Sequence, residues 1–255
     1  MNASERINSA PGPAELGSGP RPEDGIGWGE RLRTAKDIAT RLGAILSKET
    51  IHTLDAIISY LECGRWLTSQ RMQIPRRVES RVNVYDQVIE ILRDQPILYL
   101  EFGVWQGRSI RYWSERLSNP QSQFHGFDSF EGLPESWNML FKKGLFSTHG
   151  RIPEIDDPRV KFFKGWFEDT LPRYQPPPHG QLVINIDADL YSSTRVVLNA
   201  LKSQISVGTY IYFDEFCDRN HELRAFDEFL AETHMRFEVA SASRSLMYIA
   251  FRRVA

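Results

Sequence analysis

The chain has 255 residues, of which 41% are hydrophobic, and its formal net charge is −2 at pH 7 with a pI of about 6.3. This length allows one α/β domain with a sizeable core and appendages. The near-neutral charge argues against a nucleic-acid or anionic-membrane partner, because binding either depends on a basic surface. No apolar run approaches the roughly 20 residues that span a bilayer, and the first residues lack the apolar core of a signal peptide. We therefore expect a cytoplasmic protein whose partner is a small, neutral or weakly charged molecule.

The N-terminal region differs in composition from the rest. Residues 1 to about 27 are rich in Pro, Gly, Ser, Asn and Glu, and we expect a disordered tail because they have almost no apolar surface to bury. Helical periodicity then predicts two amphipathic helices. We expect residues 28–77 to form either a helical cap on the following domain or a dimerisation element, which would give a homo-oligomer. The apolar positions of the first helix are Ile38, Leu42, Ile45 and Leu46, and those of the second are Ile51, Leu54, Ile57, Ile58 and Leu61.

From about residue 78 onward, apolar runs alternate with helical patterns, as a doubly wound, mostly parallel α/β sheet requires. A helix over 78–93 should turn one face to the sheet, namely Val82, Tyr85, Val88, Ile89 and Leu92. Strands are predicted near 97–102, 123–127, 160–164, 182–187 and 209–213, with helices near 107–118, 168–173, 192–205 and 220–232. Two last strands, near 236–240 and 246–251 and joined by a Ser-rich turn, predict a C-terminal antiparallel hairpin.

A long segment of mixed polarity, from about residue 133 to 157, interrupts this alternation. Long loops in compact domains are usually lids or disordered segments. Because this one leaves the strand that ends at Asp128, we expect a lid over a ligand site, with a plain surface loop as the alternative. The side chains that could close on a ligand are Trp137, Phe141, Phe146 and His149.

The segment Tyr99–Ile110, with the sequence YLEFGVWQGRSI, has the form of a cofactor site. Its apolar run ends in an acid, Glu101, and open α/β sheets place ligands at the carboxyl ends of such buried strands. Gly103 and Gly107 permit a tight turn and the close approach of a ligand. The spacing is not the G-x-G-x-x-G of dinucleotide folds, since Trp105 stands where the middle glycine would be. We therefore favour S-adenosylmethionine over NAD, with Glu101 engaging the ammonium group of its methionine part.

Acids at the ends of the following strands extend this candidate site. Asp128 is placed where a carboxylate can bind both ribose hydroxyls. Asp187 and Asp189 follow the fourth predicted strand, and Asp214 and Glu215 follow the fifth. These strands should be neighbours, so the carboxylates gather in a small volume, and a hard cation such as Mg²⁺ would relieve their repulsion. The alternative is that each acid caps the helix that follows it, above all Asp189.

Two smaller features concern aromatic residues and cysteines. Gly165, Trp166 and Phe167 directly follow the third predicted strand, where they could contact an adenine by stacking and through the backbone, or simply pack in the core. Cys63 and Cys217 lie far apart in the sequence and lack ligand spacing. We expect two ordinary thiols rather than a disulfide framework or a zinc site.

Four motifs, GVWQG, GFDSFEGLP, DADLYSST and YFDEF, together resemble the macrocin and mycinamicin O-methyltransferase family, which methylates sugars of natural products. The resemblance covers roughly residues 78–216 and implies a Rossmann-like class I S-adenosylmethionine-dependent methyltransferase domain over 78–255, with a divalent metal beside the methyl donor. The family's metal ligands match Asp187, Asp214 and Glu215, although its characterised members carry Asp-Asp where this chain has Asp-Glu. The expected cofactor-binding residues are Glu101, Phe102, Gly103, Trp105, Gly107, Ser109, Asp128, Ser129, Gly165, Trp166, Phe167 and Asp187.

Methyl transfer to a hydroxyl requires an aligned nucleophile, removal of its proton and exclusion of water. Chelation of two vicinal hydroxyls by Mg²⁺ would lower the pKa of one, while Asp189 or His149 accepts the proton. Three hypotheses remain open. The first is a Mg²⁺-assisted O-methyltransferase acting on a sugar or glycosylated natural product, as in antibiotic biosynthesis. The second is a metal-independent O- or N-methyltransferase that uses Asp189 or proximity alone, and the third is a non-catalytic binding module on the same fold.

Overall fold

The computed structural model describes residues 26–255, so the predicted tail lies outside the described residues except for its last two positions. The chain divides into two compact units, one reaching to Ile51 and the other covering His52–Ala255. Helix α1 (Ile26–Gly43) lies in the first, and α2 (Lys48–Ser69) begins there and continues into the second. Both predicted N-terminal helices are therefore present. Ile45 and Leu46 were wrongly assigned to the first helix, because α1 ends at Gly43 and they lie in the connection.

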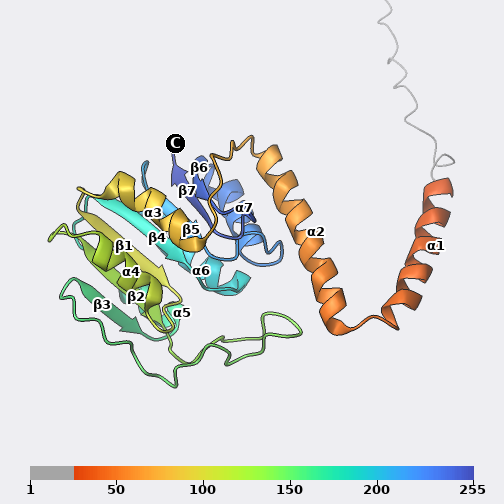
Figure 1. Cartoon of the computed structure of the whole chain (residues 1–255), viewed down its shortest axis with the longest axis horizontal. Coiled ribbons are helices and arrows are strands. Elements are labelled where there is room, and N and C mark those ends of the chain that lie inside the picture. The colour runs from red at the N-terminus through yellow and green to blue at the C-terminus, as the bar shows by residue number, and fades with distance from the viewer. Residues whose placement is uncertain (1–25) are drawn as a thin grey trace, which may run out of the picture. The chain divides into compact units, whose positions relative to one another are not determined.

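The larger unit is built on one sheet with the strand order β3-β2-β1-β4-β5-β7-β6 (Figure 1). Strands β1 to β5 are parallel, while β7 runs antiparallel to both of its neighbours, β5 and β6. This confirms the predicted doubly wound sheet with a C-terminal antiparallel hairpin. The order reverses between β1 and β4, which is the switch point where such sheets bind ligands. The strands are β1 (Ile97–Phe102), β2 (Gln123–Asp128), β3 (Val160–Lys164), β4 (Gln181–Ile186), β5 (Tyr210–Phe213), β6 (Phe237–Ala242) and β7 (Ile249–Arg253).

Helices cover both faces of this sheet. The helices α3 (Arg81–Leu92) and α4 (Arg108–Arg116) share one hydrophobic cluster with residues of β1 such as Ile97 and Tyr99. The opposite cluster contains Leu98, Leu100 and Phe102 of the same strand, as the alternation of side chains along a strand requires. It includes residues of α6 (Tyr191–Leu201), α7 (Glu222–Thr233) and the C-terminal half of α2, while α5 (Phe167–Thr170) and a 3₁₀ turn (Leu171–Arg173) lie between β3 and β4 in the chain.

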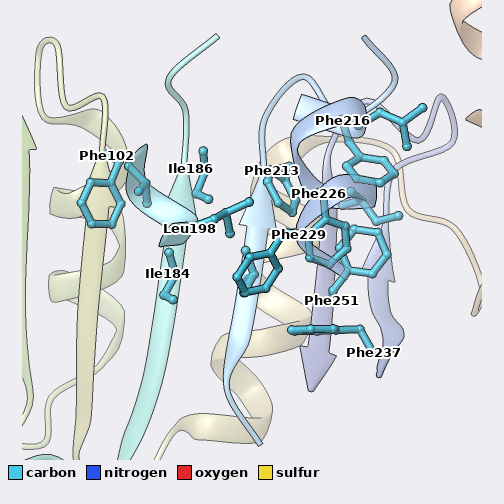
Figure 2. Close-up of a cluster of buried hydrophobic side chains, with 14 of the residues drawn as sticks. Phe102, Ile184, Ile186, Leu198, Phe213, Phe216, Phe226, Phe229, Phe237 and Phe251 are labelled. Carbon is cyan, nitrogen blue, oxygen red and sulfur yellow. The ribbon is translucent and has the colours of Figure 1, made fainter. Parts of the chain in front are cut away.

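The second cluster is rich in phenylalanine and ties α2 to the domain. Figure 2 shows the aromatic residues of β5, β7 and α7 gathered beside the aliphatic residues of β4. Trp66 of α2 meets the edge of Phe216 at 5.4 Å and donates a hydrogen bond from Nε1 to Asp227 Oδ1 at 2.6 Å. The part of α2 that follows His52 is therefore a fixed element of this unit. Whether residues 28–77 also form a dimerisation element stays a prediction.

Two boundary predictions were wrong for local reasons. The helix predicted from residue 78 begins only at Arg81, and Val82 is 41% exposed, since the buried residues of α3 start at Val84. The last strand begins at Ile249 rather than at 246, because a turn closes before it, with Leu246 in a left-handed conformation at φ 63°. Residues 129–159 form neither helix nor strand, as expected for the predicted lid segment.

The two cysteines lie side by side although 154 positions separate them in the sequence. Both are buried free thiols, Cys63 on α2 and Cys217 after β5, and their Sγ atoms are 2.8 Å apart. No sequence pattern indicated this contact, since it depends on how α2 packs. Among the described helices, none is long and apolar enough to cross a bilayer.

Candidate active site

A cavity of about 330 Å³ lies at the carboxyl ends of the parallel strands, at the switch point of the sheet. Its size is within the usual range for small-molecule sites. Most of the residues predicted from the sequence line it, namely Gly103, Trp105, Ser109, Asp128, Ser129, Gly165, Trp166, Phe167, Asp187, Asp189, Asp214 and Glu215. The structure does not bring Glu101, Phe102, Gly107 or His149 to its wall.

Gly103 lets the ends of β1 and β4 meet at the cavity floor. Its φ is +92°, and a Cβ atom there would lie 1.8 Å from the carbonyl oxygen of Asp187. Beside it, the amide of Asp187 donates to the carbonyl of Phe102 at 2.9 Å. A side chain at position 103 would therefore displace the strand that carries the acids. Gly107 serves a different contact. A Cβ atom there would lie 2.9 Å from Cγ of Pro153, so its absence leaves room for the 129–159 loop.

Asp128 organises the turn that follows β1. Its Oδ2 accepts hydrogen bonds from the amides of Val104 at 2.8 Å and Trp105 at 2.7 Å, and its Oδ1 accepts one from the amide of Phe130 at 2.6 Å. Trp105 is held in a left-handed conformation at φ 47°, which costs a side-chain-bearing residue energy. The carboxyl group thus fixes the β1 and β2 loops relative to each other and also faces the cavity.

Glu101 lies beneath the cavity rather than in its wall. Its side chain shares a face of β1 with Tyr99, so it points towards α4, and the residue is 1% exposed. The Tyr99 hydroxyl donates to Oε2 at 2.5 Å, and Asn185 Nδ2 donates to the same oxygen at 3.3 Å. Burial raises the pKa of Glu101 to about 8, although these hydrogen bonds lower it in part. The predicted contact of Glu101 with a cofactor ammonium is therefore not arranged in this structure, and Phe102 is likewise a core residue, stacked on Phe127 at 4.9 Å.

The four predicted acids Asp187, Asp189, Asp214 and Glu215 do meet in one cavity wall. Burial raises the pKa of Asp187 well above its usual range, and the carboxyl groups of Asp214 and Asp189 raise it further. Burial, followed by Asp214 and Asp189, raises the pKa of Glu215 to about 8. The Tyr212 hydroxyl donates to Asp214 Oδ1 at 2.8 Å. The wall therefore holds several carboxyl groups whose joint ionisation is unfavourable.

Sequence reasoning missed two charged residues that bear on this cluster. Arg81, the first residue of α3, places Nη1 3.1 Å from Asp214 Oδ1 and 3.4 Å from Asp187 Oδ2. Glu222 is fully buried at the start of α7, where its Oε2 accepts a hydrogen bond from the amide of Glu215 at 3.0 Å. Neither residue belongs to a motif, and both reach the cluster through tertiary packing alone.

The donor chemistry of this wall suits a hard cation, because carboxylate oxygens are the ligands that Mg²⁺ prefers. The positions of these carboxyl groups suit a metal ion less well, since no group of three His, Cys, Asp or Glu residues within 26–255 is placed to hold one. The guanidinium of Arg81 supplies positive charge to Asp187 and Asp214 instead.

Asp189 does not cap the helix that follows it. Helix α6 begins at Tyr191 after Leu190, without a side-chain capping bond, and the Tyr191 amide donates to His221 Nδ1 at 3.0 Å. Asp189 itself is held in a left-handed conformation at φ 59° and faces the cavity. Burial, aided by Asp214 and Asp218, raises its pKa to about 7. The capping alternative therefore fails for Asp189.

The predicted lid segment supplies an aromatic wall. Trp137, Phe141 and Phe146 line the cavity, and Phe146 meets the edge of Trp105 at 5.8 Å. His149 lies elsewhere, in a separate surface hollow beside Ser147 and Pro153. It therefore does not line the cavity that holds the acid cluster.

The sequence profile of the family described as Macrocin-O-methyltransferase (TylF) matches residues 72–249. The chain belongs to this family. Curated relatives include an 8-demethyl-8-(2,3-dimethoxy-alpha-L-rhamnosyl)-tetracenomycin-C 4'-O-methyltransferase of Streptomyces olivaceus, which is 30% identical over 46% of this chain and 52% of its own. A demethyldecarbamoylnovobiocin O-methyltransferase of Streptomyces niveus is 35% identical over 37% of this chain and 36% of its own. The mycinamicin III 3''-O-methyltransferase of Micromonospora griseorubida is 29% identical over 38% and 35%. The chain thus spans about half of the first relative's length and about a third of the other two.

Solved structures agree with the family on the fold. The O-methyltransferase NovP matches with a TM-score of 0.53 at 24% identity, over 69% of this chain and 78% of its own. The calicheamicin methyltransferase CalS11 matches with a TM-score of 0.51 at 19% identity, over 96% and 99%. The fold of the family member described here is therefore that of class I methyltransferases, as predicted. Helix α2 ends before the residues that the family profile matches.

Proposed function

We propose that this protein is an S-adenosylmethionine-dependent O-methyltransferase that methylates a hydroxyl group of a sugar or glycosylated natural product. The observation that carries the proposal is the acid-lined cavity at the switch point of a sheet whose family is named for an O-methyltransferase. The curated relatives are O-methyltransferases, and the name of the Streptomyces olivaceus enzyme includes a rhamnosyl group.

In this proposal the cofactor follows the wall formed by the ends of β1, β2 and β3. Asp128 keeps oxygen lone pairs for the ribose hydroxyls beside its three backbone bonds. Gly165, Trp166 and Phe167 receive the adenine. Asp187, at the point where β1 and β4 meet, takes the role at the ammonium group that the sequence assigned to Glu101, since it faces the cavity and Glu101 does not.

The reacting hydroxyl would then lie beside the second wall, among Asp189, Asp214 and Glu215. Asp189 is the residue we assign as proton acceptor, because its carboxyl group faces the cavity and is not engaged in capping α6. The aromatic side chains of Trp137 and Phe141 also line the cavity and would exclude water from the transfer step. His149 has no part in this arrangement.

The role of a metal is a separate part of the proposal. Asp187, Asp214 and Glu215 would be the ligands of Mg²⁺, which would supply positive charge that lowers the pKa of the acceptor hydroxyl. Arg81 favours the alternative, in which the guanidinium offsets the charge of Asp187 and Asp214 and no metal is needed. The two versions differ in one measurable property, the effect of EDTA on turnover.

Calorimetric titration with S-adenosylhomocysteine, with and without Mg²⁺, tests the cofactor assignment. We expect binding in both conditions, followed by methyl transfer to glycosylated acceptors. Turnover that is lost in EDTA and restored by Mg²⁺ would support the metal-assisted version, and full turnover in EDTA would support the metal-free one. Absence of cofactor binding by folded protein would reject both and leave the non-catalytic module.

A further inference from the structure

The only two cysteines of the chain, Cys63 and Cys217, are in contact with each other. Their Sγ atoms are 2.8 Å apart, and a disulfide bond is about 2.05 Å long, so the two sulfur atoms need to approach by less than about 1 Å to form one. Within residues 26–255, no three His, Cys, Asp or Glu residues are grouped to hold a metal ion. The pair is therefore placed as a dithiol rather than as half of a metal site.

The contacts around the pair hold both sulfur atoms where they are. On one side, Trp66 lies one helical turn after Cys63 on α2 and meets the edge of Phe216 at 5.4 Å. On the other side, Phe216 directly precedes Cys217, is fully buried, and donates from its amide to the carbonyl of Met247 at 2.9 Å. The approach of the two thiols is thus set by packing that does not involve the thiols themselves.

A small molecule can reach this buried pair from a second cavity. Cys63 is 0% exposed and Cys217 is 3% exposed, but Cys217 lines a cavity of about 180 Å³ between α2 and the segment after β5. This volume exceeds by far the roughly 10–15 Å³ that holds one water molecule, so hydrogen peroxide fits. A tripeptide thiol is too large to reach the enclosed sulfur of Cys63. Cys217 is therefore the thiol that meets a small oxidant, and Cys63 is the second thiol of the pair.

A bond at this position would join two parts of the chain that are otherwise held only by non-covalent contacts. Cys63 belongs to α2, which ends before the family match begins at residue 72. Cys217 follows Asp214 and Glu215, the acids after β5 that line the candidate active site. The two cysteines are 154 positions apart in the sequence, and a bond that closes so long a loop strongly restricts the unfolded chain.

We propose that Cys63 and Cys217 are a redox-sensitive modification site, where a peroxide converts the two thiols into an intramolecular disulfide that fastens α2 to the segment carrying Asp214 and Glu215. This inference does not depend on the proposed activity. It adds a covalent connection between the catalytic domain and a helix that lies outside the family match.

The chemistry needs only the two thiols and one molecule of hydrogen peroxide. Cys217 loses its proton and its sulfur attacks one peroxide oxygen, which breaks the O–O bond and leaves a sulfenic acid and one water. The sulfur of Cys63 then attacks that of Cys217, so the S–S bond forms, the S–O bond breaks, and the proton of Cys63 leaves with the second water. The two thiols lose two electrons and two protons in total, and the peroxide takes them up as two water molecules.

The first step should be slow. Cys217 donates a hydrogen bond to Cys63, and this bond, together with burial, raises the pKa of the Cys217 thiol. Only the thiolate reacts with a peroxide, and it is scarce at neutral pH when the pKa is raised. The test therefore uses incubation for hours rather than a brief exposure.

Bond formation is tested on the folded, full-length protein, which is first reduced and freed of reductant and then incubated with hydrogen peroxide. Peptide mapping without reductant should find one linked pair of peptides, containing Cys63 and Cys217, and thiol titration in urea should find both free thiols lost. Gel filtration should show the same size as for the reduced protein. Retention of both free thiols, oxygen added to the cysteines without a link, or a link between two chains alone would each overturn the proposal.

The fastening role is tested by comparing the oxidised and reduced wild-type proteins. The oxidised protein should have a thermal midpoint higher by about 5 °C or more, because the long closed loop restricts the unfolded chain. Amide hydrogen exchange over residues 60–69 of α2 should slow by about tenfold or more. A disulfide that changes neither quantity would overturn the fastening role.

Two controls separate the disulfide from other effects of peroxide, such as methionine oxidation. Cys63→Ser and Cys217→Ser, given the same treatment, should show no rise of the thermal midpoint. Oxidised wild-type protein incubated with dithiothreitol, which restores thiols but not methionine, should return to the midpoint of the reduced protein. The second control needs no variant, so it stands if neither serine variant folds. A rise that persists after the thiols are restored, or that appears in a serine variant, would overturn the assignment to this pair.

Discussion

Replacing Glu101 with glutamine tests the buried acid that the sequence assigned to the cofactor ammonium and that the structure places beneath the cavity. In the folded protein burial raises the pKa of Glu101 to about 8 from its usual 4.5. The folded state therefore keeps a proton that the unfolded chain loses above pH 4.5, and the wild-type protein loses stability as the pH rises from 4.5 towards 8. The side chain of the Glu101→Gln variant cannot ionise and carries no such penalty.

The magnitude follows from the width of that pH window. Each pH unit within it is worth about 1.4 kcal/mol, so between pH 5 and pH 7 the variant should gain about 3 kcal/mol of unfolding free energy relative to wild type. Urea unfolding of both proteins at several pH values measures this difference. Glu115→Gln, on an exposed position of α4, controls for the loss of one charge.

The same variant tests where the cofactor binds. Because Glu101 lies beneath the cavity, Glu101→Gln should bind S-adenosylhomocysteine within about threefold of wild type, a difference below about 1 kcal/mol. A free-energy difference that stays constant with pH would refute the reasoning about burial. Loss of cofactor binding in a folded variant would restore Glu101 to the ammonium contact that the sequence suggested.

Three further substitutions examine the cavity itself. Gly103→Ala places a Cβ 1.8 Å from the Asp187 carbonyl at a positive φ, so it should lower the urea midpoint and weaken S-adenosylhomocysteine binding by about tenfold or more, at least about 1.4 kcal/mol; wild-type behaviour would show that β1 and β4 do not meet as described. Asp128→Asn exchanges one accepting oxygen for a donating amide NH2 group opposite a backbone amide, and calorimetry should show a loss of about 1.5–3 kcal/mol in cofactor affinity, whereas unchanged affinity would separate this side chain from the site. Asp189→Asn should slow the single-turnover methyl-transfer step by about 10²-fold or more while cofactor affinity is kept, and an unchanged rate would remove Asp189 as the proton acceptor.

The elements that the sequence predicted well are those whose apolar pattern determines that they are buried in the sheet. The strands β4 and β5 are mostly apolar runs that form buried strands, and Asp187 and Asp214 follow them at one edge of the sheet. The sequence could therefore predict that Asp187 and Asp214 lie close together. Their meeting depends on strand order alone, which the alternation of strands and helices already restricts.

What the sequence missed depends on side-chain direction and on packing between distant segments. Glu101 follows the alternation of β1 and so points to α4, which the motif spacing alone did not decide. Arg81 reaches the acids from the first turn of a helix that carries no motif. His149 shares a loop with Phe146 but not its orientation, and the contact of Cys63 with Cys217 exists only because α2 packs against the segment after β5.

The most direct test of the central claim is a single-turnover reaction of the protein with S-adenosylmethionine and a phenyl glycoside, analysed by mass spectrometry of the acceptor. We predict that the glycoside gains one methyl group on a hydroxyl oxygen in equal amount to the S-adenosylhomocysteine formed, and that Asp189→Asn forms both products more slowly. Binding of the cofactor that leaves the glycoside unmodified, with S-adenosylhomocysteine absent from the products, would contradict the proposed function.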